Sequence, residues 1–108
     1  MYYTYMLRCS DNSIYTGITT DVSRRFAEHQ GRIPRKCAKY TGSRQAVSID
    51  AVWQSESRET ASRLEFYLKK LTKDKKERLI ADNDNFDKFL GSKLNPEVYI
   101  RVSEVKIG

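Results

Sequence analysis

A glutamate set in an apolar helical stripe is the residue of this sequence that most needs a chemical explanation. Glu65 follows Ala61 by four residues and precedes Leu68 by three, which places it on or at the edge of the apolar face of a predicted helix. Glutamate is rarely buried without a partner, because removing its charge from water is costly. Either Glu65 lies at the rim of the stripe and reaches solvent, or its carboxylate meets a cation in a cleft. That cation would be a metal ion, Arg25, or both.

Two further pairs of residues have spacings that would bring their side chains together. Arg25 and His29 are four residues apart in a predicted helix, so they are neighbours on one helical face. Tyr5 and Tyr15 lie in two successive predicted strands. Taken singly, these residues have ordinary structural interpretations as surface charges and as aromatic residues of a sheet. Taken together, they raise the alternative that both phenols face a common site.

The elements that must position these side chains follow from the apolar periodicity and the turn residues. Alternation predicts a hairpin of two strands, and the 3.6-residue spacing of leucines predicts helices later in the chain. The predicted strands span 2–9, 14–18 and 46–54, and the predicted helices span 22–31, 61–71, 74–81 and 86–90.

These elements predict an α/β protein of the α+β type. Its small three-stranded antiparallel sheet is flanked by helices, in the order ββαβαα with a short C-terminal extension. Within the extension, residues 98–105 are a possible strand or tail. At 108 residues, we expect one structural unit, with a principal domain over 1–82 and the extension 83–108 packed on it.

The charge distribution favours a polyanionic partner. The formal net charge is +6, and residues 1–80 carry sixteen Lys and Arg against nine Asp and Glu. No acid occurs between Gln30 and Ile49, a segment with five basic residues. Such a field suits nucleic acid, although a solvated basic surface is the simpler alternative. With one histidine and no C-x-x-C spacing, the sequence excludes a zinc site and leaves a hard cation held by a carboxylate.

The combination of these residues resembles the GIY-YIG nuclease family, most closely its small single-domain bacterial members. The resemblance covers roughly residues 2–80 and includes the stretches IYTGITTDVSRRFAEH and AKYT. It is carried by Tyr5, by the triplet Tyr15-Thr16-Gly17, by the Arg25 and His29 pair, and by Glu65.

This chain departs from the family pattern at two positions of the signature triplets. Tyr3 replaces the glycine of the first triplet, and Thr16 is the middle residue of the second. Neither change removes a tyrosine of the site or Gly17, which would allow a close backbone approach. Some family members also use a late asparagine, for which Asn83 and Asn85 are the candidates.

The resemblance implies a metal-dependent endonuclease that hydrolyses phosphodiester bonds in DNA. Glu65 would anchor Mg²⁺ or Mn²⁺, with water and phosphate oxygens as the other ligands, and Arg25 would contact the scissile phosphate. Tyr15 would be the general base, which requires a nearby guanidinium and metal ion because a free phenol has a pKa of about 10. Tyr5 would position the water or the phosphate, and His29 would tune Tyr15 or relay a proton.

Two groups of basic residues are candidates for contacts with the nucleic acid. In the first, the cations would follow the phosphate backbone and an aromatic ring would stack on a base; this group is Arg24, Arg32, Arg35, Lys36, Lys39, Tyr40 and Arg44. The second is interpreted as a solvated helix face, although it would extend the same track; it consists of Lys69, Lys70, Lys73, Lys75 and Lys76.

Several properties of the substrate and the assembly stay open at this point. The alternative function is a nucleic-acid-binding module without catalysis, and RNA is an alternative substrate. Single-stranded, duplex and branched DNA are not distinguished. No apolar run approaches the roughly 20 residues that span a bilayer, and no signal peptide is recognisable, so we expect a cytoplasmic protein without membrane contact. A monomer is expected, with the oligomeric state left open.

Overall fold

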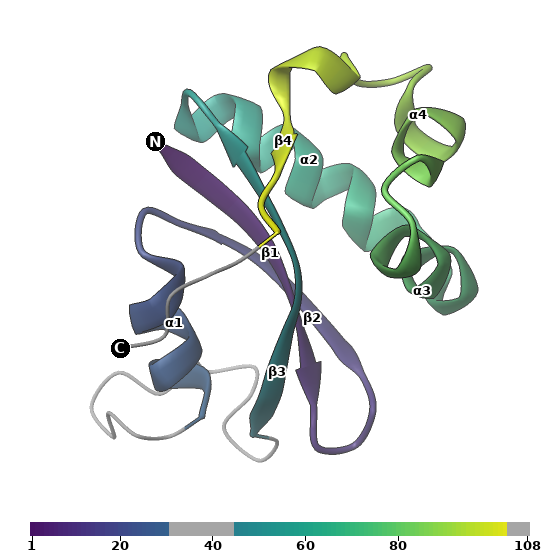
Figure 1. Cartoon of the computed structure of the whole chain (residues 1–108). Coiled ribbons are helices and arrows are strands. Elements are labelled where there is room, and N and C mark those ends of the chain that lie inside the picture. The colour runs from purple at the N-terminus through teal and green to yellow at the C-terminus, as the bar shows by residue number, and fades with distance from the viewer. Residues whose placement is uncertain (31–44, 104–108) are drawn as a thin grey trace.

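The fold is a twisted antiparallel sheet between helices, seen in a computed structural model that describes residues 1–30 and 45–103 (Figure 1). The strands are β1 (Tyr2–Cys9), β2 (Ile14–Thr19), β3 (Ala46–Ser55) and β4 (Ile100–Arg101), in the spatial order β2-β1-β3-β4. Every neighbouring pair is antiparallel. β2 is therefore an edge strand and β1 a central one.

The sequence-based prediction of three strands is wrong, because β4 adds a fourth. Trp53 and Gln54 of β3 pair with Arg101 and Ile100 of this short strand. Two residues are too few to produce an alternating pattern, so the pairing depends on tertiary packing rather than on local propensity. The order ββαβαα is otherwise observed, followed by a further helix, a 3₁₀ turn and β4.

The helices begin at capping side chains that the sequence displays. Asp21, Ser57 and Thr72 each accept a hydrogen bond from a backbone N–H in the first turn of a helix. They start α1 (Val22–His29), α2 (Arg58–Lys70) and α3 (Lys73–Ala81), which are followed by α4 (Asn85–Leu90) and the 3₁₀ turn η3 (Pro96–Val98).

Two of the predicted helices extend beyond the observed ends. Leu71, predicted as part of the apolar stripe of α2, is the extended C-cap residue after the helix, although its side chain still packs against the core. α1 ends at His29, and Gly31, expected to close this helix, lies outside the described residues.

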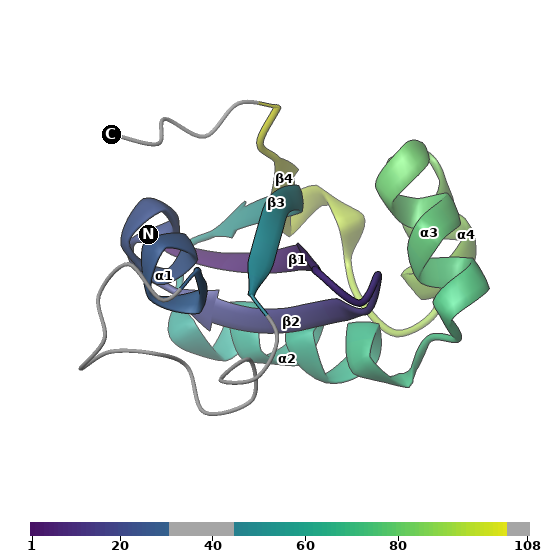
Figure 2. The same ribbon diagram turned by 90° about the horizontal axis from the view of Figure 1, so that it is seen from below.

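The side chains of β1 enter two separate cores, as the predicted alternation requires. Tyr5 and Leu7 point toward α1 and pack with Val22 and Phe26, whereas Met6 points toward the opposite face. α1 and α2 thus cover opposite faces of the sheet, with α3 and α4 beside α2 (Figures 1 and 2).

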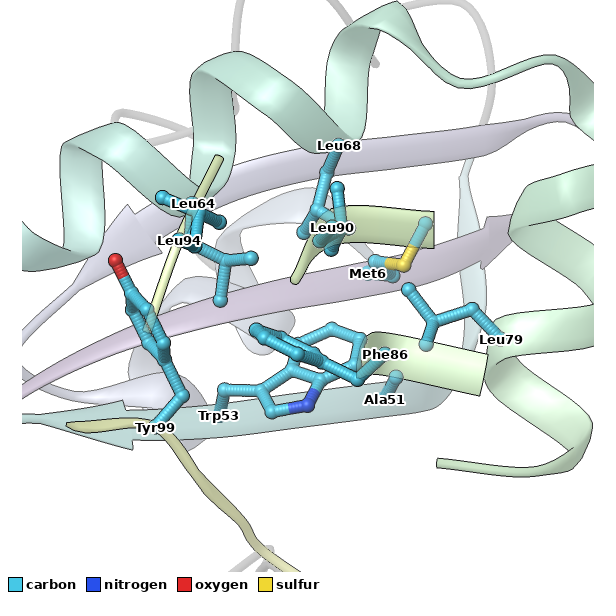
Figure 3. Close-up of a cluster of buried hydrophobic side chains, with 10 residues drawn as sticks. All are labelled: Met6, Ala51, Trp53, Leu64, Leu68, Leu79, Phe86, Leu90, Leu94 and Tyr99. Carbon is cyan, nitrogen blue, oxygen red and sulfur yellow. The ribbon is translucent and has the colours of Figure 1, made fainter. Parts of the chain in front are cut away.

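The larger core lies between the sheet and the layer formed by α2, α3 and α4 (Figure 3). The Phe86 ring centroid lies 6.0 Å from that of Trp53 and 5.5 Å from that of Tyr99, so residues after 82 complete this core. Its ten members are Met6, Ala51, Trp53, Leu64, Leu68, Leu79, Phe86, Leu90, Leu94 and Tyr99.

An ion-pair network fixes α3 against the sheet. The guanidinium of Arg8 donates from Nε to Asp50 of β3 at 3.0 Å and from Nη1 to Glu77 of α3 at 2.8 Å. Because the Arg8 side chain is only 17% exposed, these bonds are partly shielded from water.

Within the described residues, no helix is both long enough and apolar enough to cross a bilayer.

Candidate active site

The phenol of Tyr5 lies across the backbone of β2 at Gly17. These two residues are direct partners in the β1–β2 ladder, and the Tyr5 side chain is 1% exposed. A Cβ atom at Gly17 would lie 2.5 Å from Tyr5 Oη, 2.8 Å from its Cζ and 3.2 Å from Tyr15 Cε1. The two contacts with Tyr5 are too short for real atoms and the one with Tyr15 is tight, so a side chain at this position would displace the Tyr5 phenol.

His29, at the end of α1, joins the two tyrosines. Its Nε2 lies 3.2 Å from Tyr5 Oη, and its ring centroid lies 4.5 Å from that of Tyr15. The side chain is 1% exposed, and burial together with the charge of Arg25 lowers the pKa of His29 to about 4, against an opposing effect of Glu28. The imidazole is therefore neutral at pH 7.

Tyr5 keeps its proton at neutral pH. Burial raises the pKa of Tyr5 to about 12; the hydrogen bond and charge of Arg25 act in the opposite direction, and Tyr15 and Glu65 raise it further. The nearby Arg25 guanidinium can only donate, and it acts to lower the pKa of Tyr5. A protonated Tyr5 can donate its single proton to Nε2 of a neutral His29 in the tautomer that carries the imidazole proton on Nδ1.

A buried carboxylate that sequence reasoning missed holds Arg25 in place. Arg25 Nη1 donates to Glu28 Oε1 at 2.5 Å, and Arg24 Nε lies 3.6 Å from Oε2 of the same carboxylate. The Glu28 side chain is 5% exposed, whereas that of Arg25 is 32% exposed. Its spacing of three and four residues from two arginines was the available signal. Arg25 is thus held by one terminal nitrogen of its guanidinium, and its side chain remains partly exposed.

Glu65 lies on α2 with its side chain 25% exposed. Its cation partner among the described residues is Lys69, at 3.5 Å, and not Arg25. The carboxylate is close enough to Tyr5 to raise the pKa of that phenol. The part of the chain that the structure describes contains no cluster of three or more acidic, Cys or His side chains suited to a metal. One partly exposed carboxylate fits Mg²⁺, which retains water and takes phosphate oxygens as ligands.

The remaining candidates lie elsewhere or outside the described residues. Arg24 is on the exposed side of α1, with 59% of its side chain accessible. Asn83 accepts from Trp53 Nε1 at 2.8 Å, and Asn85 donates to the Arg78 carbonyl at 2.9 Å, so both amides have structural bonds. Six predicted contacts with nucleic acid lie in the segment that is not described: Arg32, Arg35, Lys36, Lys39, Tyr40 and Arg44.

The class of protein is defined by a combination of side chains. Two tyrosines come from one hairpin, an arginine and a histidine from the next helix, and a glutamate from a later helix. The GIY-YIG catalytic domain matches residues 1–78, and this chain belongs to the GIY-YIG family. That family is one of endonucleases, which generally use divalent metals.

Among its relatives are small bacterial proteins of similar length. The chain is 47% identical over 87 residues to the UPF0213 protein FN1575 of Fusobacterium nucleatum, covering 81% of this chain and 84% of the relative. It is 39% identical over 95 residues to a UPF0213 protein of Citrobacter koseri, covering 88% and 92%. The solution structure of the UPF0213 protein BH0048 of Bacillus halodurans is 43% identical, covers 75% of this chain and 84% of that one, and superposes with a TM-score of 0.47.

Proposed function

We propose that this chain is a divalent-metal-dependent endonuclease that hydrolyses phosphodiester bonds in DNA. The observation that carries the proposal is the position of the Tyr5 hydroxyl. It lies 3.2 Å from Nε2 of His29, its ring centroid is 6.2 Å from that of Tyr15, and the charges of Arg25 and Glu65 both affect its pKa. Four side chains from three other elements thus converge on one buried phenol, as a site for a phosphate and a water molecule requires.

The two phenols have different roles in this proposal. Hydrolysis forms a bond between phosphorus and a water oxygen, so a general base must take the water proton. Tyr5 is protonated and donates its single proton to His29, so it would position the water through its oxygen, which can accept a hydrogen bond from that water. Tyr15 is only partly buried and therefore takes the role of base. His29 acts through Tyr5, since its neutral imidazole orients the phenol proton.

Arg25 and Glu65 supply the charges that a phosphodiester needs. The Arg25 guanidinium, held by Glu28, presents its remaining donors to the scissile phosphate and stabilises negative charge there. Glu65 would hold the divalent cation, exchanging its ion pair with Lys69 for the metal. When bound, that cation supplies positive charge to the phosphate and to the leaving oxygen.

Replacement of Arg25 tests this assignment. We expect Arg25→Ala to lower the cleavage rate with Mg²⁺ by about 10²- to 10³-fold, the range for losing one donor that stabilises transition-state charge. The matched control is Arg24→Ala on the exposed side of the same helix, for which we expect weaker binding but nearly unchanged kcat. Circular dichroism checks that both variants fold. An Arg25→Ala protein that cuts at the wild-type rate would refute the site.

The alternative function, a nucleic-acid-binding module without catalysis, is an outcome of the same assay. Binding without cleavage in both Mg²⁺ and Mn²⁺ on every substrate form would favour it. Cleavage of RNA in place of DNA would retain the chemistry and change the substrate.

A further inference from the structure

An open pocket of about 250 Å³ lies at the edge of β2, next to the candidate active site. Its walls come from three elements: Ile14, Tyr15 and Thr16 of β2, Lys69 of α2 and Lys76 of α3. Tyr15 therefore lines both this pocket and the active site. The two lysines are the charged residues on its walls, and none of the acids among residues 1–30 and 45–103 lines it.

The two lysines place two positive charges close to each other. Burial and the neighbouring Lys69 lower the pKa of Lys76, which shows that the two ammonium groups repel each other and that Lys76 is partly shielded from water. Lys69 also pairs with Glu65 at 3.5 Å, whereas Lys76 has no ion pair among residues 1–30 and 45–103. An anion between the two lysines would relieve this repulsion.

The other three lysines of this basic group have different environments. Lys70 Nζ lies 4.3 Å from the centroid of the Phe66 ring, and Lys75 Nζ lies 5.7 Å from that of Phe89. Lys73 is exposed, and its charge acts on Glu77. These three side chains do not line the pocket, whereas Lys69, which is 56% exposed, and Lys76, which is only partly exposed, both do.

The position of Lys76 is fixed by the packing of its helix. The next residue along α3, Glu77, accepts from Arg8 of β1, and Thr72 caps the N-terminus of the same helix. On the β2 wall, the side chain of Thr16 is 3% exposed, and its hydroxyl has no hydrogen-bond partner within the described parts of the chain. The pocket therefore combines two cations from separate elements with a preformed wall.

We propose that Lys69 and Lys76 bind a phosphate of the nucleic acid that is not cleaved, on the same strand as the phosphate held at Tyr15 and Arg25. A nucleic acid strand carries a phosphate on either side of the one being cut. A second subsite that binds a phosphate is therefore expected beside the first. The pocket shares Tyr15 with the site. A nucleic acid strand that passes from the site into the pocket would cross the edge of β2 toward α2 and α3. This inference rests on the proposed substrate class but not on catalysis.

Equilibrium binding without divalent metal tests this subsite. The probe is a short fluorescein-labelled single-stranded DNA in EDTA, with fluorescence anisotropy measured over a series of salt concentrations. The variants are Lys76→Gln, which leaves the Glu65–Lys69 pair intact, and Lys73→Gln, which removes the same charge from an exposed position of α3. We expect Lys76→Gln to weaken binding severalfold and to reduce the slope of log K against log salt by about 0.7, the value for one single-strand phosphate contact. Lys73→Gln leaves that slope unchanged.

The outcomes separate this inference from the proposed hydrolysis. Equal effects of the two variants, or an unchanged slope for a folded Lys76→Gln protein, would show a general electrostatic field and overturn the subsite. Absence of DNA binding by the wild-type protein would overturn it as well. If Lys76→Gln alone reduces the salt slope but the wild-type protein cuts no substrate, the subsite is supported and the nuclease proposal is refuted. If the wild-type protein cuts DNA but Lys76→Gln and Lys73→Gln have equal slopes, the nuclease proposal is supported and the subsite is refuted.

Discussion

At the scale of single residues, the site depends on one glycine that lets two phenols meet. Tyr5 is fully buried, and its hydroxyl end lies so close to Gly17 that a Cβ atom there would clash with it. The expected close approach at Gly17 is thus made by a side chain of the protein itself. His29 then fixes the phenol by a hydrogen bond. The glycine therefore acts on the site through Tyr5.

Substitution of Gly17 tests this dependence. We expect Gly17→Ala to reduce cleavage by about 10²-fold, because the added Cβ must displace the Tyr5 phenol and a shift of about 1 Å in a positioning group has effects of this size. The measurement is kcat/KM with Mg²⁺, compared with the free energy of unfolding of the same variant.

Gly91 offers a matched control far from the site in sequence. A Cβ at Gly91 would lie 2.3 Å from the Asp87 carboxylate, so Gly91→Ala introduces a similar clash at the end of α4. We expect it to lower stability but to leave the activity of the folded protein unchanged. Equal losses of activity in the two variants would contradict a specific role for Gly17.

At the scale of elements, α1 is held to the sheet through a buried neutral histidine. Val22 and Phe26 supply its apolar contacts, and His29 bonds to Tyr5 of β1. The same helix carries Arg25, which Glu28 orients by a hydrogen bond and whose charge lowers the pKa of His29. The docking of α1 and the geometry of the candidate site are therefore coupled, and protonation of His29 would disturb both.

This coupling predicts a loss of stability in mild acid. The pKa of His29 is about 4 in the folded protein and 6.5 ordinarily, so the unfolded chain binds more protons between these values and stability falls as pH decreases through them. We expect this residue to contribute about 2 to 3 kcal/mol to the drop in the free energy of unfolding between pH 7 and pH 4. Denaturant titrations of wild type and His29→Gln measure it. Parallel pH dependences of the two proteins would contradict the assignment.

At the scale of the whole molecule, sequence patterns predicted the sheet and most of the helices, but they left residues 98–105, which contain the closing strand, as either a strand or a tail. In β1, Tyr5 points toward α1 and Met6 toward α2, as the two-residue period of a strand predicted. β4 has only two residues, and it is held to β3 by pairing and by Arg101, which stacks on Trp53 and donates to the Ile80 carbonyl. Such long-range contacts leave no periodic trace in the sequence.

The grouping of the site residues was only partly predicted, because some of their contacts depend on tertiary packing. The i, i+4 spacing placed Arg25 beside His29, but a bond between His29 and Tyr5 depends on how α1 packs on the sheet. Glu28 was missed because a glutamate next to two arginines is usually a surface residue, and its burial is a tertiary property. Lys69 pairs with Glu65 because it lies four residues further along the same helix, where side chains of opposite charge are neighbours.

The net charge of +6 on the whole molecule attracts a polyanion such as nucleic acid. Within the described residues, the site at β2 lies between Arg25 on one helix and the Lys69 and Lys76 pocket on two others. A strand of nucleic acid that crosses the edge of β2 would thus meet cations from several elements. This arrangement supports an extended nucleic acid as the substrate.

The central claim is tested most directly by cleavage of a substrate panel with wild-type and Glu65→Ala proteins. The panel contains single-stranded, duplex and branched DNA and RNA, each with Mg²⁺, Mn²⁺ or EDTA, and Glu59→Ala is the control for loss of an exposed carboxylate from the same helix. We expect metal-dependent cutting of DNA by the wild type and by Glu59→Ala, and none by Glu65→Ala, which retains binding. A Glu65→Ala protein that cuts at the wild-type rate, or a wild-type protein that binds every substrate and cuts none, would contradict the account.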